Sequence, residues 1–191
     1  MKSFTRIARQ LNLTAVAAVA LAAVALPQAA QAVLAVGQTA PAFELPDLDG
    51  KTVSLAAFRG KTVVLEWINP NCPVSRDYAE RKVMSTTAAA HPAVVWLAIN
   101  STNRTHGDFV APAAHKAYNQ KNGIAYPVLY DSAGDTGRAY DAKTTPHMFI
   151  IDPAGKVVYN GAIDSRSETA NVNYVDAALT ALAAGKSPDP S

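Results

Sequence analysis

The chain has 191 residues, of which 49% are apolar and 17% charged, and its formal net charge is +2. This length corresponds to one domain of about 100–200 residues, and the apolar fraction excludes an intrinsically disordered protein. The single cysteine, Cys72, excludes an intramolecular disulfide, a zinc site made of several cysteines and a self-contained dithiol redox centre.

The first 32 residues have the layout of a secretory signal peptide. A basic head, an apolar run and a pair of small residues follow one another, at Lys2, Arg6 and Arg9, at residues 11–26, and at Ala30-Gln31-Ala32. We expect cleavage between Ala32 and Val33, because the apolar run is shorter than the ~20 residues that a membrane-spanning helix needs. The cleaved chain has 14 Lys and Arg against 15 Asp and Glu, so no basic surface indicates nucleic acid binding.

The predicted organisation is a signal peptide over residues 1–32, one folded domain over residues 33–185 and a flexible tail over residues 186–191. An alanine-rich signal of this kind predicts the periplasm of a Gram-negative bacterium, with no membrane span after cleavage. That compartment is oxidising, so an exposed lone thiol there is open to oxidation. We expect no metal or other cofactor, because the four histidines are dispersed and the chain has no glycine-rich phosphate loop.

Short β-branched runs alternate with helical patterns, which predicts an α/β fold with a mixed central sheet flanked by helices. Asp49-Gly50 predicts a β-hairpin between residues 43–45 and 52–55. The apolar run at residues 62–68 predicts a buried strand. One helix is expected from Pro73 to about Ala90, because proline suits the first helical turn.

The second half of the chain continues this alternation. Strands are predicted at residues 94–99, 127–130, 147–151 and 156–159, and helical segments at residues 107–121 and 134–140. A last helix is marked by apolar residues at i, i+3, i+4 and i+7 from Val175. Gly185 is placed to cap the end of that helix.

Cys72 lies where a buried strand ends and a helix begins, within residues 67–76 (WINPNCPVSR). The unpaired N–H groups and the positive dipole end of a helix favour an anion at this position. A thiolate is such an anion, so we expect a lowered pKa and a reactive sulfur. Arg76 adds positive charge four residues later. The alternative, a lone cysteine that acts as a small buried apolar residue, is disfavoured by this context.

A second feature is Thr145-Pro146 directly before the strand at residues 147–151. Proline at the start of a central strand is unusual, because it cannot donate a hydrogen bond to the neighbouring strand. A cis bond between Thr145 and Pro146 fits this position, since cis peptide bonds are almost confined to proline.

Together these features resemble the thioredoxin-like superfamily. Residues 36–43 (VGQTAPAF) and 58–61 (FRGK) resemble its redoxin branch, the alkyl hydroperoxide reductase/thiol-specific antioxidant (AhpC/TSA) group, and the segment from Asn69 to Pro73 resembles a single-cysteine Asn-x-x-Cys-Pro subgroup. The resemblance spans about residues 36–185. It implies a thioredoxin-like fold with an N-terminal β-hairpin extension and an inserted β-α unit.

The resemblance also assigns roles to residues. Cys72 takes the place of the nucleophilic cysteine of a Cys-x-x-Cys motif, and Ser75 takes the place of the resolving cysteine. Thr145 and Pro146 take the place of the cis-proline loop, and with Pro73 they are expected to bind the substrate. We expect Ser75 and Asn69 to hydrogen-bond the sulfur, and Arg76 to support its ionisation. Because a hydroxyl does not exchange with disulfides, a mixed disulfide on Cys72 needs an external thiol or a second subunit.

The function predicted from these features is that of a periplasmic thiol oxidoreductase, an enzyme that exchanges with protein or small-molecule thiols and disulfides. One alternative is a one-cysteine peroxiredoxin-like peroxidase that acts on peroxides. Leu65, Asn69 and Pro146 stand where the peroxiredoxin signature has proline, threonine and arginine, which counts against it. Two further alternatives are a non-catalytic thioredoxin-fold binding module and a dimer linked through Cys72.

Overall fold

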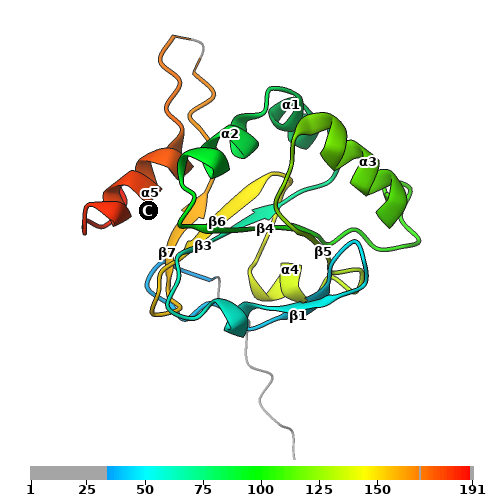
Figure 1. Cartoon of the computed structure of the whole chain (residues 1–191), viewed down its shortest axis with the longest axis horizontal. Helices are drawn as coiled ribbons and strands as arrows, with labels where there is room; N and C mark the ends of the chain where they lie inside the picture. Colours follow the sequence, from blue (N-terminus) through cyan, green and yellow to red (C-terminus); the bar gives the residue numbers. More distant parts are fainter. Residues whose placement is uncertain (1–33, 168, 190–191) are drawn as a thin grey trace, which may run out of the picture. The chain divides into compact units, whose positions relative to one another are not determined.

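The computed structural model describes residues 34–167 and 169–189, so the predicted signal peptide lies outside the described residues (Figure 1). In the described chain the elements follow in the order β1 (Glu44–Pro46), β2 (Thr52–Ser54), the 3-10 turn η1 (Leu55–Phe58), β3 (Val63–Trp67), α1 (Pro73–Glu80), α2 (Val83–Ala90), β4 (Val95–Asn100), α3 (Pro112–Asn122), β5 (Val128–Tyr130), α4 (Asp135–Ala139), β6 (His147–Ile151), β7 (Val157–Gly161) and α5 (Tyr174–Ala183). Of the predicted tail, residues 186–189 are described, and Pro188 is buried.

The main sheet has five strands in the order β5-β4-β3-β6-β7. β3, β4 and β5 run parallel, whereas β6 is antiparallel to both β3 and β7. This mixed sheet between helices is a thioredoxin-like fold, which confirms the expected fold class. The N-terminal extension is the antiparallel hairpin β1–β2, and the inserted β-α unit is β5 with α4, which lies between α3 and β6 in the chain.

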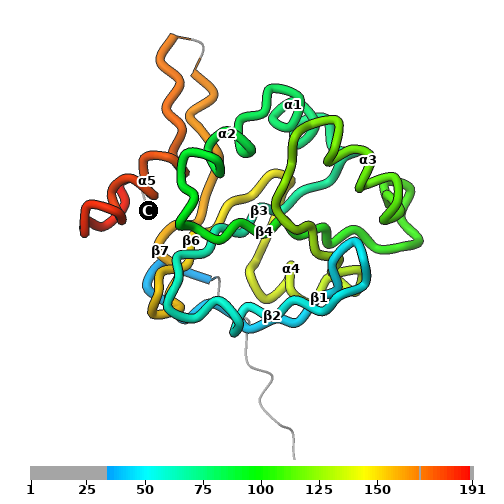
Figure 2. The backbone as a smooth tube through the Cα atoms, viewed as in Figure 1, coloured from blue at the N-terminus to red at the C-terminus, as the bar shows by residue number. Residues whose placement is uncertain are grey.

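Two apolar layers enclose the sheet. Helices α1, α2, α3 and α5 lie on one face, and α4 and the β1–β2 hairpin lie on the other (Figures 1 and 2). Because side chains alternate along a strand, Leu65 and Trp67 of β3 pack toward the hairpin while Val64 packs against the helices. All five residues of β3 are buried, so this strand is the centre of the core and a rigid base for the loop that follows it.

The predicted single helix from Pro73 to about Ala90 is wrong, because the structure has two helices there. Lys82 lies between α1 and α2 with φ +57°, in the left-handed region that ends a helix. In one continuous helix, Tyr78 and Met84 would lie about 120° apart around the axis. The break lets both side chains enter the same apolar cluster under the helices.

The predicted start of the next helix is also wrong, since α3 begins at Pro112 and not at Gly107. The backbone of Ala111 is extended, with φ −65° and ψ 150°. A residue before proline avoids the helical region because its backbone clashes with the proline ring. Pro112 therefore sets the boundary, and residues 101–111 form a loop at the carboxyl end of β4.

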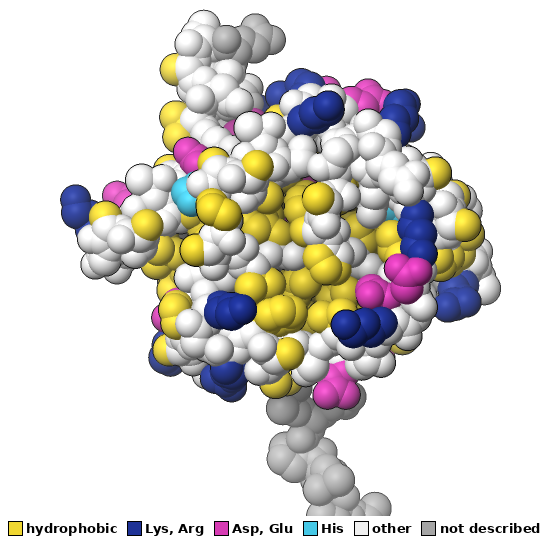
Figure 3. Space-filling model, in the orientation of Figure 1, with side chains coloured by type: hydrophobic (Ala, Val, Ile, Leu, Met, Phe, Trp, Pro, Cys, Tyr) yellow, Lys and Arg dark blue, Asp and Glu magenta, His cyan; other side chains and the backbone are white. Residues whose placement is uncertain are grey.

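An apolar hollow of about 550 Å³ lies between α2 and the segment that follows α3 (Figure 3). Its lining comes from α2, from the first residues of β4 and from the loop before β5, and includes Ala88, Val95, Trp96 and Tyr126. Because β3 and β4 are parallel, this hollow lies at the opposite edge of the sheet from the loop that follows β3.

Candidate active site around Cys72

Cys72 is the residue that precedes the first turn of α1, and Pro73 is the first helical residue. The Cys72 N–H donates to the Asn69 carbonyl at 3.0 Å, and the Cys72 carbonyl accepts from the N–H of Arg76 at 2.9 Å. These bonds hold a tight turn between the end of β3 and α1. The sulfur therefore lies at a helix N-terminus, where an anion is favoured.

The sulfur meets a second loop that is 73 positions away in the chain. Cys72 Sγ lies 3.0 Å from the Thr145 carbonyl oxygen, to which the thiol donates. The peptide bond between Thr145 and Pro146 is cis. Cys72, Thr145 and Pro146 are all half-buried, so the sulfur remains within reach of a partner from solvent. Pro73, the next residue in the chain and the first of α1, is exposed.

The pKa of Cys72 is lowered from its ordinary value. Burial of the sulfur is the largest influence and opposes ionisation, but it is outweighed by several smaller ones. These are hydrogen bonding with the Thr145 side chain, hydrogen bonding with the backbone N–H groups of Ser75 and Val74, and the positive charge of Arg76. The thiolate is thus favoured by the start of α1, as expected for a nucleophilic cysteine.

The expected hydrogen bonds from Asn69 and Ser75 to the sulfur are not formed within the described residues. Asn69 Oδ1 accepts the Asn71 N–H at 2.8 Å, and Asn69 Nδ2 donates to Thr102 Oγ1 at 2.9 Å. Ser75 Oγ accepts the Asn69 N–H at 3.3 Å. Both side chains are buried and need a local partner, so they brace the turn and tie it to the loop after β4 instead of contacting the sulfur.

Glu66 is a buried acid in β3 that the sequence analysis missed. Its carboxylate accepts a hydrogen bond from the Tyr126 hydroxyl at 2.6 Å. Burial raises its pKa to about 7, against the lowering effect of that hydrogen bond. Tyr118 lies within the electrostatic influence of both Glu66 and Cys72. A single charged residue inside the apolar run at residues 62–68 was the sequence signal that could have identified it.

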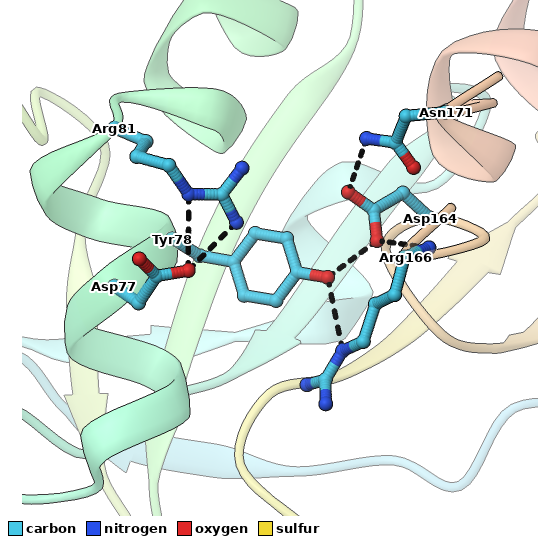
Figure 4. A network of polar contacts seen from close by, with 6 residues as sticks. All are labelled: Asp77, Tyr78, Arg81, Asp164, Arg166 and Asn171. Carbon is cyan, nitrogen blue, oxygen red and sulfur yellow. Dashed lines mark hydrogen bonds and ion pairs between the residues drawn. The ribbon is translucent and has the colours of Figure 1, made fainter. Parts of the chain in front are cut away.

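A polar network beside the site was also missed (Figure 4). The hydroxyl of Tyr78, on α1, donates to Asp164 Oδ1 and accepts from Arg166 Nε at 3.3 Å. Asn171 Nδ2 donates to the other oxygen of Asp164 at 2.8 Å. The network joins α1 to the segment between β7 and α5, a long-range pairing that no local sequence pattern indicates.

The comparisons with known proteins agree with this geometry. A sequence model of the AhpC/TSA family matches residues 36–160, well over half of the chain. The chain belongs to the AhpC/TSA family. This matched region begins near the first described residues and ends within β7, so it contains both Cys72 and the Thr145–Pro146 loop.

Two curated relatives of this AhpC/TSA chain differ in the activity that their names give. The thiol-disulfide oxidoreductase ResA of Bacillus thuringiensis subsp. konkukian is 29% identical over 127 residues, which are 64% of this chain and 67% of the relative. The putative peroxiredoxin MT2597 of Mycobacterium tuberculosis is 28% identical over 139 residues, which are 64% of this chain and 81% of the relative. The matched part of ResA is thus about two thirds of its length.

A solved structure also resembles this chain closely. It is an uncharacterized conserved protein from Geobacillus kaustophilus, with a TM-score of 0.72 and 28% identity, and the match covers 82% of this chain and 86% of that one. The relatives place the chain among thioredoxin-like thiol-disulfide oxidoreductases and peroxiredoxins, with one cysteine in its 191 residues.

Proposed function

We propose that this protein is a periplasmic thiol-disulfide oxidoreductase that works through one reactive cysteine. The observation that carries the proposal is the position of the Cys72 sulfur, at the start of α1 and 3.0 Å from the Thr145 carbonyl. The Cys72 thiol has a lowered pKa, which favours the nucleophilic thiolate. It also lies beside the backbone of Thr145, which can pair with a bound peptide.

The reaction is an exchange of disulfide bonds. The Cys72 thiolate attacks one sulfur of a substrate disulfide, a new bond forms between the two sulfurs, and the other substrate sulfur leaves as a thiolate that takes a proton from solvent. The thiol–carbonyl contact at Thr145 ends when Cys72 ionises, which frees that carbonyl to accept an N–H of the substrate. Thr145, Pro146 and Pro73 then border the substrate on its two sides.

The second half of the reaction requires a thiol from outside the chain. Ser75 stands on α1 one turn from Cys72, and its hydroxyl cannot displace a sulfur from a disulfide. An external thiolate attacks the mixed disulfide, takes the substrate half as a new disulfide and releases the Cys72 thiolate. The chain therefore transfers a thiol group between two partners, and it is neither oxidised nor reduced over a complete cycle.

The test is the pH dependence of Cys72 alkylation in the native and the unfolded chain. We expect the native rate to reach half its maximum at a lower pH than the unfolded rate, because only the thiolate is alkylated. Trapping of mixed disulfides, with Cys72→Ser as the control, identifies the partners. Slow native labelling with an ordinary or raised pKa would overturn the proposal and favour a non-catalytic binding module.

The periplasmic location rests on the N-terminal sequence pattern. Among the described residues, no helix is long and apolar enough to cross a membrane. N-terminal sequencing of the protein from a periplasmic extract is expected to begin at Val33. A protein recovered from the cytoplasm with residues 1–32 intact would contradict this location.

Peroxidase activity is a second candidate, favoured by the match to a putative peroxiredoxin. A peroxide oxidises the Cys72 thiolate to a sulfenic acid and leaves as water or an alcohol, and an external thiol then reduces the sulfenic acid. Leu65 and Asn69, at two positions of the peroxiredoxin signature, are committed to the core and to the turn. We therefore expect slow peroxide consumption. A fast second-order reaction of Cys72 with hydrogen peroxide would favour peroxidase activity over disulfide exchange.

A further inference from the structure

Two adjoining hollows are lined by the residues that flank Cys72 and Thr145 in the chain. One hollow, of about 620 Å³, is bordered by Pro73 and Val74. The other, of about 370 Å³, is bordered by Thr144 and Pro146. Both are lined by Tyr78, Asp164 and Arg166, so they share one wall. We call this the Arg166 groove, and a substrate attacked by Cys72 would extend into it.

The shared wall is built from buried polar groups. Tyr78 and Asp164 are 3% and 4% exposed. Asp164 accepts hydrogen bonds from the Tyr78 hydroxyl, from Asn171 Nδ2 at 2.8 Å and from the backbone N–H of Arg166 at 3.1 Å. Burial opposes the ionisation of Asp164, but these bonds outweigh it and lower its pKa. The Asp164 carboxylate is therefore hydrogen-bonded to donors of the protein itself.

The two arginines beside Tyr78 are in different situations. Arg81 is bound by Asp77, with Nη2 2.7 Å from Asp77 Oδ2. Arg166 contacts the Tyr78 hydroxyl through Nε, and its guanidinium lies 5.6 Å from the centre of the Tyr78 ring. Its two terminal nitrogens point away from Asp164 (Figure 4). Among the described residues, no carboxylate lies within 4.0 Å of the Arg166 guanidinium.

From this arrangement we infer that Arg166 binds a carboxylate of the substrate, so that the preferred substrates are disulfides whose leaving or retained half is acidic. This inference rests on the proposed function. A guanidinium offers two parallel N–H groups that match the two oxygens of a carboxylate. Contact with Tyr78 fixes Nε and leaves the terminal nitrogens for the ligand. Arg166 is a binding residue here, and the sulfur exchange itself is unchanged.

The test compares three small disulfides whose terminal groups are negative, neutral and positive: bis(2-carboxyethyl), bis(2-hydroxyethyl) and bis(2-aminoethyl) disulfide. The second-order rate of mixed-disulfide formation at Cys72 is followed by mass spectrometry. Arg166→Gln is expected to slow the dicarboxylate by about fivefold, the effect of one solvent-exposed charge pair. The neutral probe should react at an unchanged rate. Arg166→Lys, which keeps the charge but not the paired N–H groups, should fall between.

Arg138→Gln is the matched control, because this exposed arginine pairs with Asp135 on α4, on the opposite face of the sheet. It should leave all three rates unchanged. Added salt should reduce the preference for the dicarboxylate in the parent protein. An acidic peptide disulfide, compared with its amidated form, shows whether the carboxylate of a peptide is recognised as well as that of a small molecule.

The outcomes separate this inference from the proposed function. If Cys72 reacts with all three probes and Arg166→Gln changes none of them, or all of them equally, the inference is overturned while the function stands. If Cys72 reacts with no disulfide, the proposed function fails. In that case, calorimetry measures the binding of the dicarboxylate to Cys72→Ser and to the double variant that also carries Arg166→Gln. Weaker binding by the double variant supports a carboxylate site at Arg166. Equal binding by both variants, or none by either, overturns the inference.

Discussion

At the scale of single residues, the pKa of Cys72 is lowered by Thr145, by the start of α1 and by Arg76, and not by the side chains of Asn69 and Ser75. The N-terminal amides of α1 and the Thr145 carbonyl face Cys72, while Asn69 and Ser75 hold the turn that carries it. The residue type and its place before a helix could be predicted from sequence. The partners of Asn69 and Ser75 could not, because a buried amide or hydroxyl bonds whichever group the fold brings near it.

Glu66 makes the stability of the protein depend on pH. Its pKa is raised by burial from about 4.5 to about 7, so the folded state holds a proton that the unfolded state has released between these values. The contribution of Glu66 to stability therefore falls as pH rises through this window, by about 3 kcal/mol in total. The buried His115 contributes in the opposite direction, because burial lowers its pKa from 6.5 to about 4. Glu66→Gln removes the Glu66 contribution and keeps that of His115. We therefore expect the unfolding free energy of the variant, relative to that of the parent, to rise between pH 5 and pH 8, as urea unfolding at both pH values measures.

The control for this measurement is Glu44→Gln, which changes an exposed carboxyl on β1. It should keep the pH dependence of the parent protein. A difference between Glu66→Gln and the parent that is the same at both pH values would show that Glu66 does not hold a proton in the fold.

At the scale of elements, the break between α1 and α2 depends on one residue in an unfavourable conformation. Lys82 has φ +57°, where a side chain clashes with the following carbonyl and glycine does not. We expect Lys82→Gly to stabilise the protein by about 0.5–1 kcal/mol, as seen in the midpoint of chemical unfolding.

Lys121→Gly is the matched control for the helix break. Lys121 lies in the last turn of α3 with ordinary helical geometry, so glycine there should destabilise the protein by about 1 kcal/mol. If both variants lose stability to the same extent, the left-handed conformation at Lys82 is not the origin of the break.

At the scale of the whole molecule, the Tyr78–Asp164 pair joins α1 to the segment between β7 and α5, which extends away from the sheet (Figure 2). Tyr78→Phe removes the hydroxyl and leaves the buried Asp164 with one donor fewer. We expect a loss of about 1–3 kcal/mol, because a buried acceptor that loses a partner keeps its desolvation penalty. Thermal unfolding and amide exchange of residues 162–173 measure the loss and show where it acts.

Tyr118→Phe is the control for this loss. The Tyr118 hydroxyl is buried and has no hydrogen-bond partner among the described residues, so its removal should leave stability unchanged or slightly raised. Equal losses in the two tyrosine variants would mean that the loss at Tyr78 does not come from the bond to Asp164.

Local residue patterns are enough to predict the strand before Cys72, the start of the helix after it, the hairpin turn at Asp49-Gly50 and the family. Each follows from residues close together in the chain, through hydrophobic periodicity, proline and glycine geometry, or a short motif. The folded chain was needed to find the contact of Cys72 with Thr145, the hydrogen bond between Glu66 and Tyr126, and the wall made by Tyr78, Asp164 and Arg166. These depend on segments up to 88 positions apart, and their pairing follows from how the helices pack on the sheet.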